Sequence, residues 1–171
     1  MKVLFKISIV AAVLLSALAT TAQKAGKFGH INSNDLLLVM PEKDTAEIQL
    51  QNYAKELELQ LSTMTTEYEK KYTDYQQNVG SMSEVIRSSK EEEIMDLQNR
   101  IQEFQTRAQQ SLQKKEAEIM EPLIKKAKDA INEVAKANGY TYIFDSGVGA
   151  LLYYPEGDNI LPLVKVKMGI K

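Results

Sequence analysis

Between Pro41 and Gly139 the apolar residues recur every three or four positions, and the residues between them are mostly charged or amide-bearing. One glycine, Gly80, and one proline, Pro122, are the only helix breakers inside this stretch. Such spacing predicts α-helix, because side chains three and four positions apart share one face. The apolar stripe is narrow, so it indicates a coiled-coil-like seam rather than the broad inner face of a globular domain.

A helical stretch of this length needs a reversal near its middle. Turn residues gather at Asn78–Ser81 and, with a weaker signal, at Arg87–Ser89. We therefore expect the tip of a helical hairpin within residues 78–89. The first helix would cover roughly residues 42–78, and the second would run from the tip to Ala137, just before an Asn-Gly stop signal.

The N-terminal flank of this stretch has a different pattern. Residues 27–32 predict a β-strand, since an apolar and β-branched run is followed by turn residues. Residues 34–40 predict a short helix. Its expected N-cap is Ser33, and Pro41 is expected to end it.

The C-terminal flank also alternates short apolar runs with turn residues. Residues 140–145 and 150–154 predict two strands, and the glycine-rich segment 146–149 between them predicts a β-hairpin turn. Residues 162–168 predict a last short helix, with proline in its first turn and glycine just past its end.

These elements together predict an α+β fold. Both chain ends, residues 23–41 and 139–171, would form a small β body, and residues 42–138 would form a long antiparallel helical hairpin. A body of about 50 residues is marginal alone, and a two-helix arm has no enclosed core, so both features point to an oligomer. The expected body core and oligomer contact consists of Phe28, Ile31, Leu36, Leu37, Val39, Ile143, Leu151 and Leu152.

The first 22 residues predict a secretory signal peptide. Two lysines precede an apolar run over residues 7–18, and small residues lead to a cleavage site after Ala22. Cleavage after Ala19 is an alternative, and an uncleaved membrane anchor is another, although the run is short for a membrane span. Cleavage would make the chain an exported protein and change its formal net charge from -2 to -4, because two lysines and no acids are lost.

Composition excludes several kinds of chemistry. The chain has no cysteine and a single histidine, which excludes disulfides, thiolate metal sites and cysteine nucleophiles and disfavours histidine clusters. His30 is expected to be a structural strand residue rather than a pH sensor. Gly147–Gly149 lacks the lysine and hydroxyl residue of a phosphate-binding loop. We therefore expect no enzyme activity, no cofactor and no metal, and the negative net charge argues against nucleic-acid binding.

The order and spacing of five segments resemble the Skp/OmpH family of periplasmic chaperones. These segments are Gly29–Asn32, Met40–Pro41 before the charged hairpin, Ala135–Asp145, Leu151–Tyr154 and Leu161–Lys165. The resemblance covers the whole chain after the signal peptide. No single motif is specific to the family, whereas their order and spacing are.

The resemblance implies a homotrimer in which a small β body holds three helical tentacles around a cavity. It further implies an ATP-independent holdase for unfolded outer-membrane proteins in a Gram-negative periplasm. Well-known members are strongly basic whereas this mature chain is acidic, so we carry over no lipopolysaccharide site, and contact with a membrane surface stays open. The alternative function is a structural coiled-coil spacer or adaptor in an envelope or secretion assembly.

A holdase needs apolar side chains that unfolded clients can reach. Methionine is flexible and tyrosine has an apolar ring with a polar tip, so both suit weak contacts with many sequences. The candidate client-binding residues are Met64, Tyr68, Tyr72, Tyr75, Met82, Val85, Ile86 and Met95. The alternative for those on the stripe is packing against the second helix, whereas the ones near the tip have fewer neighbours to pack on.

Overall fold

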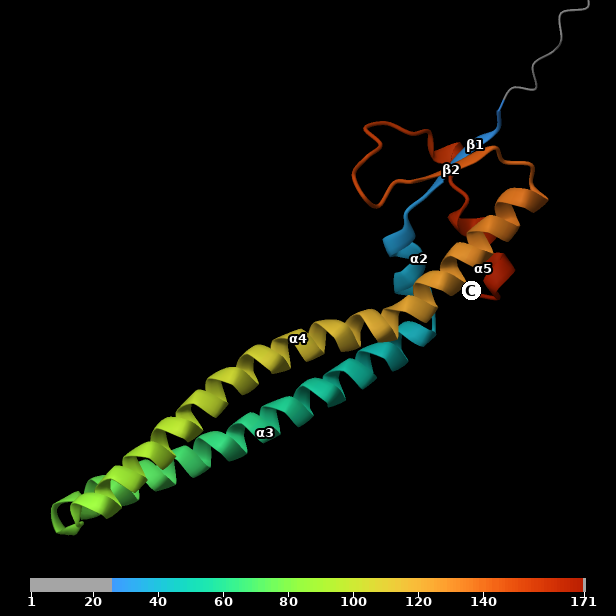
Figure 1. Cartoon of the computed structure of the whole chain (residues 1–171). Helices are drawn as coiled ribbons and strands as arrows, with labels where there is room; N and C mark the ends of the chain where they lie inside the picture. The colour runs from blue at the N-terminus through green and yellow to red at the C-terminus, as the bar shows by residue number, and fades with distance from the viewer. Residues whose placement is uncertain (1–25, 171) are drawn as a thin grey trace, which may run out of the picture.

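The computed structural model describes residues 26–170, and the predicted signal peptide lies outside them. Figure 1 shows a small body from which two long helices extend to a distant tip. The elements in chain order are β1 (Phe28–Ile31), α2 (Ser33–Val39), α3 (Glu42–Asn78), the 3-10 turn η1 (Val79–Ser81), α4 (Glu84–Ala137), β2 (Tyr142–Asp145), the 3-10 turn η2 (Glu156–Asp158) and α5 (Leu161–Met168). The predicted fold class, a small body formed by both chain ends and a long helical hairpin, is confirmed.

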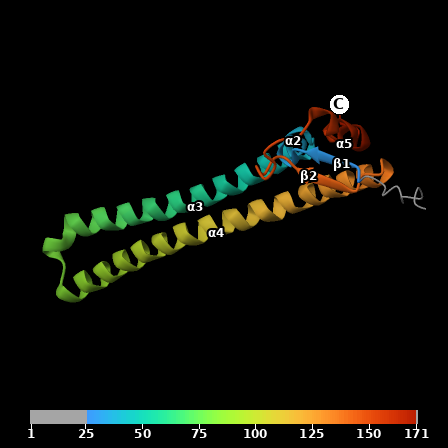
Figure 2. The same ribbon diagram turned by 90° about the horizontal axis from the view of Figure 1, so that it is seen from above.

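The hairpin consists of α3, with 37 residues, and α4, with 54 residues. The chain reverses at η1, and Ser83 then caps α4, since its hydroxyl accepts a hydrogen bond from the Ile86 N–H at 3.4 Å. Arg87–Ser89 consequently lies inside α4 rather than in the turn. Figure 2 shows α3 and α4 side by side along the whole hairpin, which we call the arm.

The core of the body forms around the part of α4 that extends past the start of α3. Every third or fourth residue of this part is buried, as the helical period requires. α2 and α5 pack against α4, and α5 lies beside its body end in Figure 1. The buried residues of this cluster are Ile31, Leu36, Met40, Ala46, Leu123, Ala127, Ala130, Val134, Ile160 and Val164.

The sheet of the body has two parallel strands, in which Phe28 pairs with Tyr142 and Ile31 with Asp145. The predicted β-hairpin between residues 140–145 and 150–154 is therefore wrong. The first of these segments contains β2, but it pairs with β1 from the other end of the chain, and residues 150–154 form no strand.

Asp145 explains why the chain does not turn back on β2. Its carboxylate accepts hydrogen bonds from the Ser33 N–H at 3.2 Å, the Ser33 hydroxyl at 2.5 Å and the Gly147 N–H at 2.8 Å. The Ser146 N–H also donates to the Ile31 carbonyl at 2.9 Å. These contacts hold the segment after β2 against the start of α2, so it cannot form a second strand beside β2.

Asn32, and not Ser33, is the N-cap of α2. The Asn32 side chain accepts hydrogen bonds from the Asn34 N–H at 3.0 Å and the Asp35 N–H at 3.3 Å. Ser33 is already helical, and its hydroxyl is used by Asp145. The predicted cap was therefore wrong by one residue: asparagine caps helices as well as serine does, and the Ser33 hydroxyl is taken up by Asp145.

The eight residues predicted for the body core and oligomer contact divide into three groups by burial. Ile31 and Leu36 are buried, and Leu37 and Ile143 pack against the core. Leu151 is half-buried. The remaining three, Phe28, Val39 and Leu152, are exposed, so they are not core residues of the single chain. Phe28 lies on the outer face of the two-stranded sheet, Val39 is the last residue of α2, and Leu152 lies in the segment that forms no strand. The role of these three residues in an oligomer contact stays a prediction.

Candidate functional site

Polar contacts join the two helices of the arm near its tip. Lys71 Nζ lies 3.0 Å from Glu93 Oε2, and this hydrogen bond raises the pKa of Lys71 and lowers the pKa of Glu93. The hydroxyl of Tyr75 donates a hydrogen bond to Glu91, which raises the pKa of Tyr75. Ion pairs that are open to water contribute little to stability. These polar contacts therefore add little to the stability of the distal arm.

Four of the predicted client-binding residues lie on α3. Met64, Tyr68 and Tyr75 are half-buried, and Tyr72 is exposed. The rings of Tyr68 and Tyr72 stack with centroids 5.9 Å apart. Part of each half-buried side chain packs in the seam between the helices, and the rest is open to water.

The other four candidates lie near the tip. Met82 is half-buried in the turn, whereas Val85, Ile86 and Met95 are 79%, 52% and 63% exposed. Their neighbours Ile94 and Leu97, on the adjoining face of α4, are buried. The start of α4 thus has a packed side and an open apolar side, and packing within the single chain does not account for the open one.

An open groove lies between the helices halfway along the arm, and we call it the mid-arm groove. It encloses about 380 Å³. Ala54 on α3 and Ala108 on α4 leave this space, because both occupy positions in the seam where larger side chains would fill it. The groove is lined by Ala54, Leu57, Glu58, Leu61, Phe104, Gln105, Ala108, Gln109 and Leu112.

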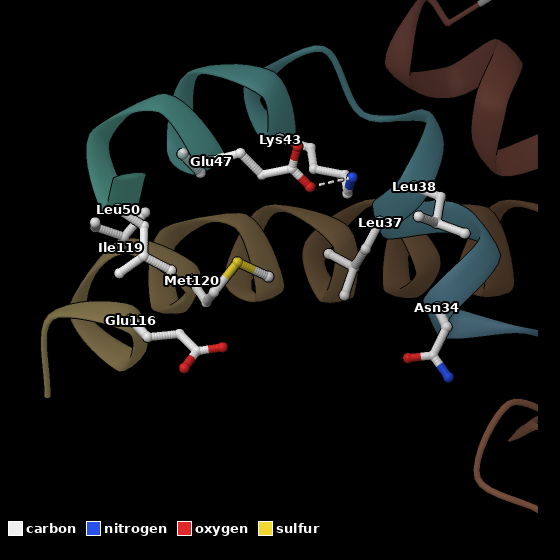
Figure 3. Close-up of a pocket in the computed structure, with 10 residues that line it drawn as sticks. Asn34, Leu37, Leu38, Lys43, Glu47, Leu50, Glu116, Ile119 and Met120 are labelled. Carbon is white, nitrogen blue, oxygen red and sulfur yellow. Dashed lines mark hydrogen bonds and ion pairs between the residues drawn. The ribbon is translucent and has the colours of Figure 1, made fainter. Parts of the chain in front are cut away.

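A second groove, of about 340 Å³, lies where the arm joins the body (Figure 3). Leu37 and Leu38 from α2 form one end of it, and Leu50, Ile119 and Met120 form the other. The ion pair between Lys43 and Glu47 borders the groove. Leu38 is largely exposed, so this groove adds apolar surface at the base of the arm.

An ion pair near this groove ties the beginning of the arm together. The Lys126 ammonium group on α4 donates a hydrogen bond to the Glu42 carboxylate in the first turn of α3. This contact lowers the pKa of Glu42. It fixes the start of α3 against α4 at the point where the arm leaves the body.

Three aromatic rings cover the outer face of the sheet. Phe28 stacks on Tyr142 with centroids 5.9 Å apart, and Phe144 lies 6.3 Å from Phe28. All three rings are exposed in the single chain. On the same face His30 is buried beneath the ring of Tyr154, 4.2 Å away between centroids. The body therefore also presents an apolar surface, which is separate from the arm.

Charge on the arm is acidic overall. Residues 42–137 contain 14 lysines and arginines against 19 aspartates and glutamates, a formal net charge of -5. Among residues 26–170 no group of three or more histidine, aspartate or glutamate side chains could hold a metal ion. No helix in that range is long and apolar enough to cross a bilayer.

Sequence reasoning missed both grooves and two exposed apolar residues of α3, Ile48 and Leu59. The sequence signal that could have found Ile48 and Leu59 is that both lie outside the apolar stripe, where an apolar side chain has no seam to pack in. The signal for the mid-arm groove was the pair of alanines within the stripe, Ala54 and Ala108. A small residue at a seam position fills the seam only if its partner is large, and sequence alone does not pair the positions.

Comparison with known proteins gives a consistent result. The protein-family model described as outer membrane protein (OmpH-like) matches residues 27–168. The chaperone protein Skp of Photorhabdus laumondii is 28% identical over 147 residues, which cover 84% of this chain and 86% of that protein. The chaperone protein Skp of Pectobacterium atrosepticum is 24% identical over 140 residues, which cover 80% and 83%. The solved structure of an OmpH-like protein from Caulobacter crescentus has the same fold, with a TM-score of 0.72 over 86% of each chain at 11% identity.

Proposed function

This chain belongs to the OmpH-like family, whose model is described as outer membrane protein (OmpH-like). From that premise we propose that it is an ATP-independent holdase chaperone for unfolded outer-membrane proteins. The observation that carries the proposal is the open apolar surface of a thin arm. Val85, Ile86 and Met95 near the tip are exposed, and the mid-arm groove opens the seam itself. The Skp relatives, which are named chaperones, support the same function.

Binding alone is sufficient for such a chaperone. An unfolded outer-membrane protein exposes apolar segments of high β-propensity, which aggregate. Separate small apolar surfaces at the tip, in the mid-arm groove and at the base of the arm would each hold such a segment weakly. Many weak contacts give a useful total affinity and still permit release, because each one breaks independently.

We assign the client-binding role to the eight predicted residues of the arm. Four of them are exposed and four are half-buried, so they differ in how much of the side chain a client can reach. Val85, Ile86, Met95 and Tyr72 are exposed before any client arrives. The half-buried Met64, Tyr68, Tyr75 and Met82 would contribute the open part of each side chain.

A homotrimer is the assembly we propose. One arm alone has no interior in which to hold a client, and the aromatic face of the sheet is exposed in the single chain. Contact between the bodies of three copies would bury Phe28, Tyr142 and Phe144, and the three arms would then surround a cavity. Mass measurement in solution tests this, since a monomer at micromolar concentration contradicts it.

The periplasm is the proposed location. In this assignment residues 1–22 are removed on export, residues 23–41 and 139–171 form the body, and residues 42–138 form the arm. N-terminal sequencing of the protein from a periplasmic extract tests the cleavage after Ala22 against the cleavage after Ala19.

Aggregation of an unfolded outer-membrane protein tests the function directly. Light scattering follows a urea-unfolded β-barrel protein after dilution, with and without the purified chain at stoichiometric amounts. We expect scattering to be suppressed without ATP. Unchanged scattering would refute the holdase and leave the structural spacer as the alternative function, although a spacer has no use for the open apolar tip.

A further inference from the structure

We propose that the mid-arm groove is a subsite for one kind of client segment: an extended stretch with a large apolar side chain followed, two residues later, by lysine or arginine. This inference rests on the proposed holdase function and specifies what that function recognises at this position. It is carried by the apolar lining of the groove, by the amides on its rim and by one acidic side chain.

The inner surface of the groove suits a single apolar side chain. Leu57 and Leu61 from α3 face Phe104 and Leu112 from α4, and the two alanines leave the space between them open. Its volume of about 380 Å³ lies at the lower end of the range of ligand pockets, about 300–1,000 Å³. Water in such a space gains few hydrogen bonds, so an apolar group that displaces it is favoured.

The amides on the rim suit an extended backbone. Gln105 and Gln109 lie one helical turn apart on α4, and their side-chain amides form no hydrogen bond with any residue of the described range. Each amide has both a donor and an acceptor. A client strand lying over the groove has unpaired N–H and C=O groups of its own, which these amides would pair.

The charge on the rim selects the neighbouring residue. Glu58 lines the groove and forms no ion pair with any residue that the structure describes, although Glu103 and Arg107 on the facing helix pair with each other. In an extended chain the side chains at positions i and i+2 lie on the same face, about 7 Å apart. A cation two positions from the apolar anchor therefore points toward the groove, within reach of Glu58 on its rim, whereas a cation at the next position points away.

The groove lies between two contacts that join α3 to α4. The hydrogen bond between Tyr53 and Ser111 lies on the side of the groove nearer the body, and the contact between Lys71 and Glu93 lies on the side nearer the tip. The groove is thus on the arm and distinct from the body, α2 and the groove of Figure 3. With a net charge of -5, the surrounding arm also favours a cationic segment over an acidic one.

Fluorescence of short peptides tests the proposal, because the chain has no tryptophan and all tryptophan emission then comes from the peptide. Three unstructured peptides differ only around one Trp: Trp-Ser-Lys, Trp-Ser-Glu and Trp-Lys-Ser. The Kd of each is measured with the purified mature chain from the blue shift of the emission. We expect Trp-Ser-Lys to bind about two- to threefold more tightly than the other two at low salt, and this preference to disappear at high salt.

Variants assign the binding to the groove. Glu58→Gln should abolish the preference for Trp-Ser-Lys, whereas Glu56→Gln, a matched change of an exposed glutamate outside the groove, should keep it. The double variant Ala54→Leu/Ala108→Leu fills the groove without removing any apolar group and should weaken all three peptides about tenfold. Ala117→Leu, at an exposed alanine of α4, should not. Circular dichroism verifies that each variant is folded.

Three results would overturn the proposal. One is a preference that survives Glu58→Gln, and another is wild-type affinity in the groove-filling variant. The third is a change in the oligomeric mass of that variant with peptide affinity unchanged, which would make the groove a contact between copies. These failures are distinguishable from failure of the holdase function, since the wild-type chain would still suppress aggregation of the unfolded outer-membrane protein.

Discussion

Asp145 is the residue whose removal most directly tests how the body is held together. Its carboxylate accepts three hydrogen bonds, two from Ser33 and one from the Gly147 N–H. In the variant Asp145→Asn the remaining oxygen can still accept the two backbone N–H groups, but the negative charge is lost. Hydrogen bonds to a charged group are about twice as strong as neutral ones. Loss of this charge assistance in three bonds predicts a destabilisation of about 2 kcal/mol.

The pH dependence of Asp145 follows from the same contacts. Burial raises the pKa of Asp145, but the hydrogen bonds from Ser33 and Gly147 outweigh burial and hold the pKa below its ordinary value of 3.8. A carboxyl with a lowered pKa in the folded state stabilises the fold above the pKa of the unfolded chain, and this contribution is lost as the pH falls through the folded pKa. The wild-type chain should therefore lose stability below about pH 4 more steeply than Asp145→Asn.

Denaturant unfolding followed by tyrosine fluorescence measures both effects, because the body contains Tyr140, Tyr142 and Tyr154. Asp158→Asn is the matched control, since the Asp158 carboxylate forms no hydrogen bond with any residue in the described part of the chain. If Asp145→Asn unfolds within about 0.5 kcal/mol of wild type, with the same slope between pH 5 and pH 2, the account of the body is wrong.

Three further changes test the core, the sheet and the tip. Leu36→Ala should destabilise the body by about 2–5 kcal/mol in denaturant unfolding, because Leu36 is fully buried; a smaller loss than that of Leu37→Ala would contradict this. Gly29→Ala should cost about 1–3 kcal/mol in the same assay, since a Cβ atom there would lie 2.9 Å from the Tyr140 ring; an unchanged midpoint would contradict it. Val85→Ser/Ile86→Ser should leave the melting temperature unchanged yet weaken client binding about three- to tenfold in a fluorescence titration, and equal affinity would exclude the tip as a contact.

The helices were predictable because their signals are local. The period of the apolar stripe, the turn residues at Asn78–Ser81 and the stop before Gly139 all lie within the elements they determine. The sheet was not predictable in this way. β2 pairs with β1 from the other end of the chain, and the local turn signal at residues 146–149 favoured a hairpin that does not form.

The candidate site was predictable only in part, for a related physical reason. Val85 and Ile86 are exposed at the tip, whose position follows from the sequence, whereas Met95 is exposed because it lies on the open side of α4 beside the buried Ile94 and Leu97. The mid-arm groove depends on which residues of α4 face Ala54. That pairing is set by the register of the two helices, which the contacts across the arm fix.

Photo-crosslinking with a trapped client tests the central claim most directly. The chain contains no cysteine, so a single cysteine carrying a photo-reactive label is unique. Labels are placed at Ile86 near the tip, at Leu59 on the arm and at Asp158 on the body as a control, and the complex with an unfolded outer-membrane protein is irradiated. We predict crosslinks to the client from Ile86 and Leu59 and few from Asp158. Crosslinks from Asp158 alone would contradict a chaperone that works through its arms.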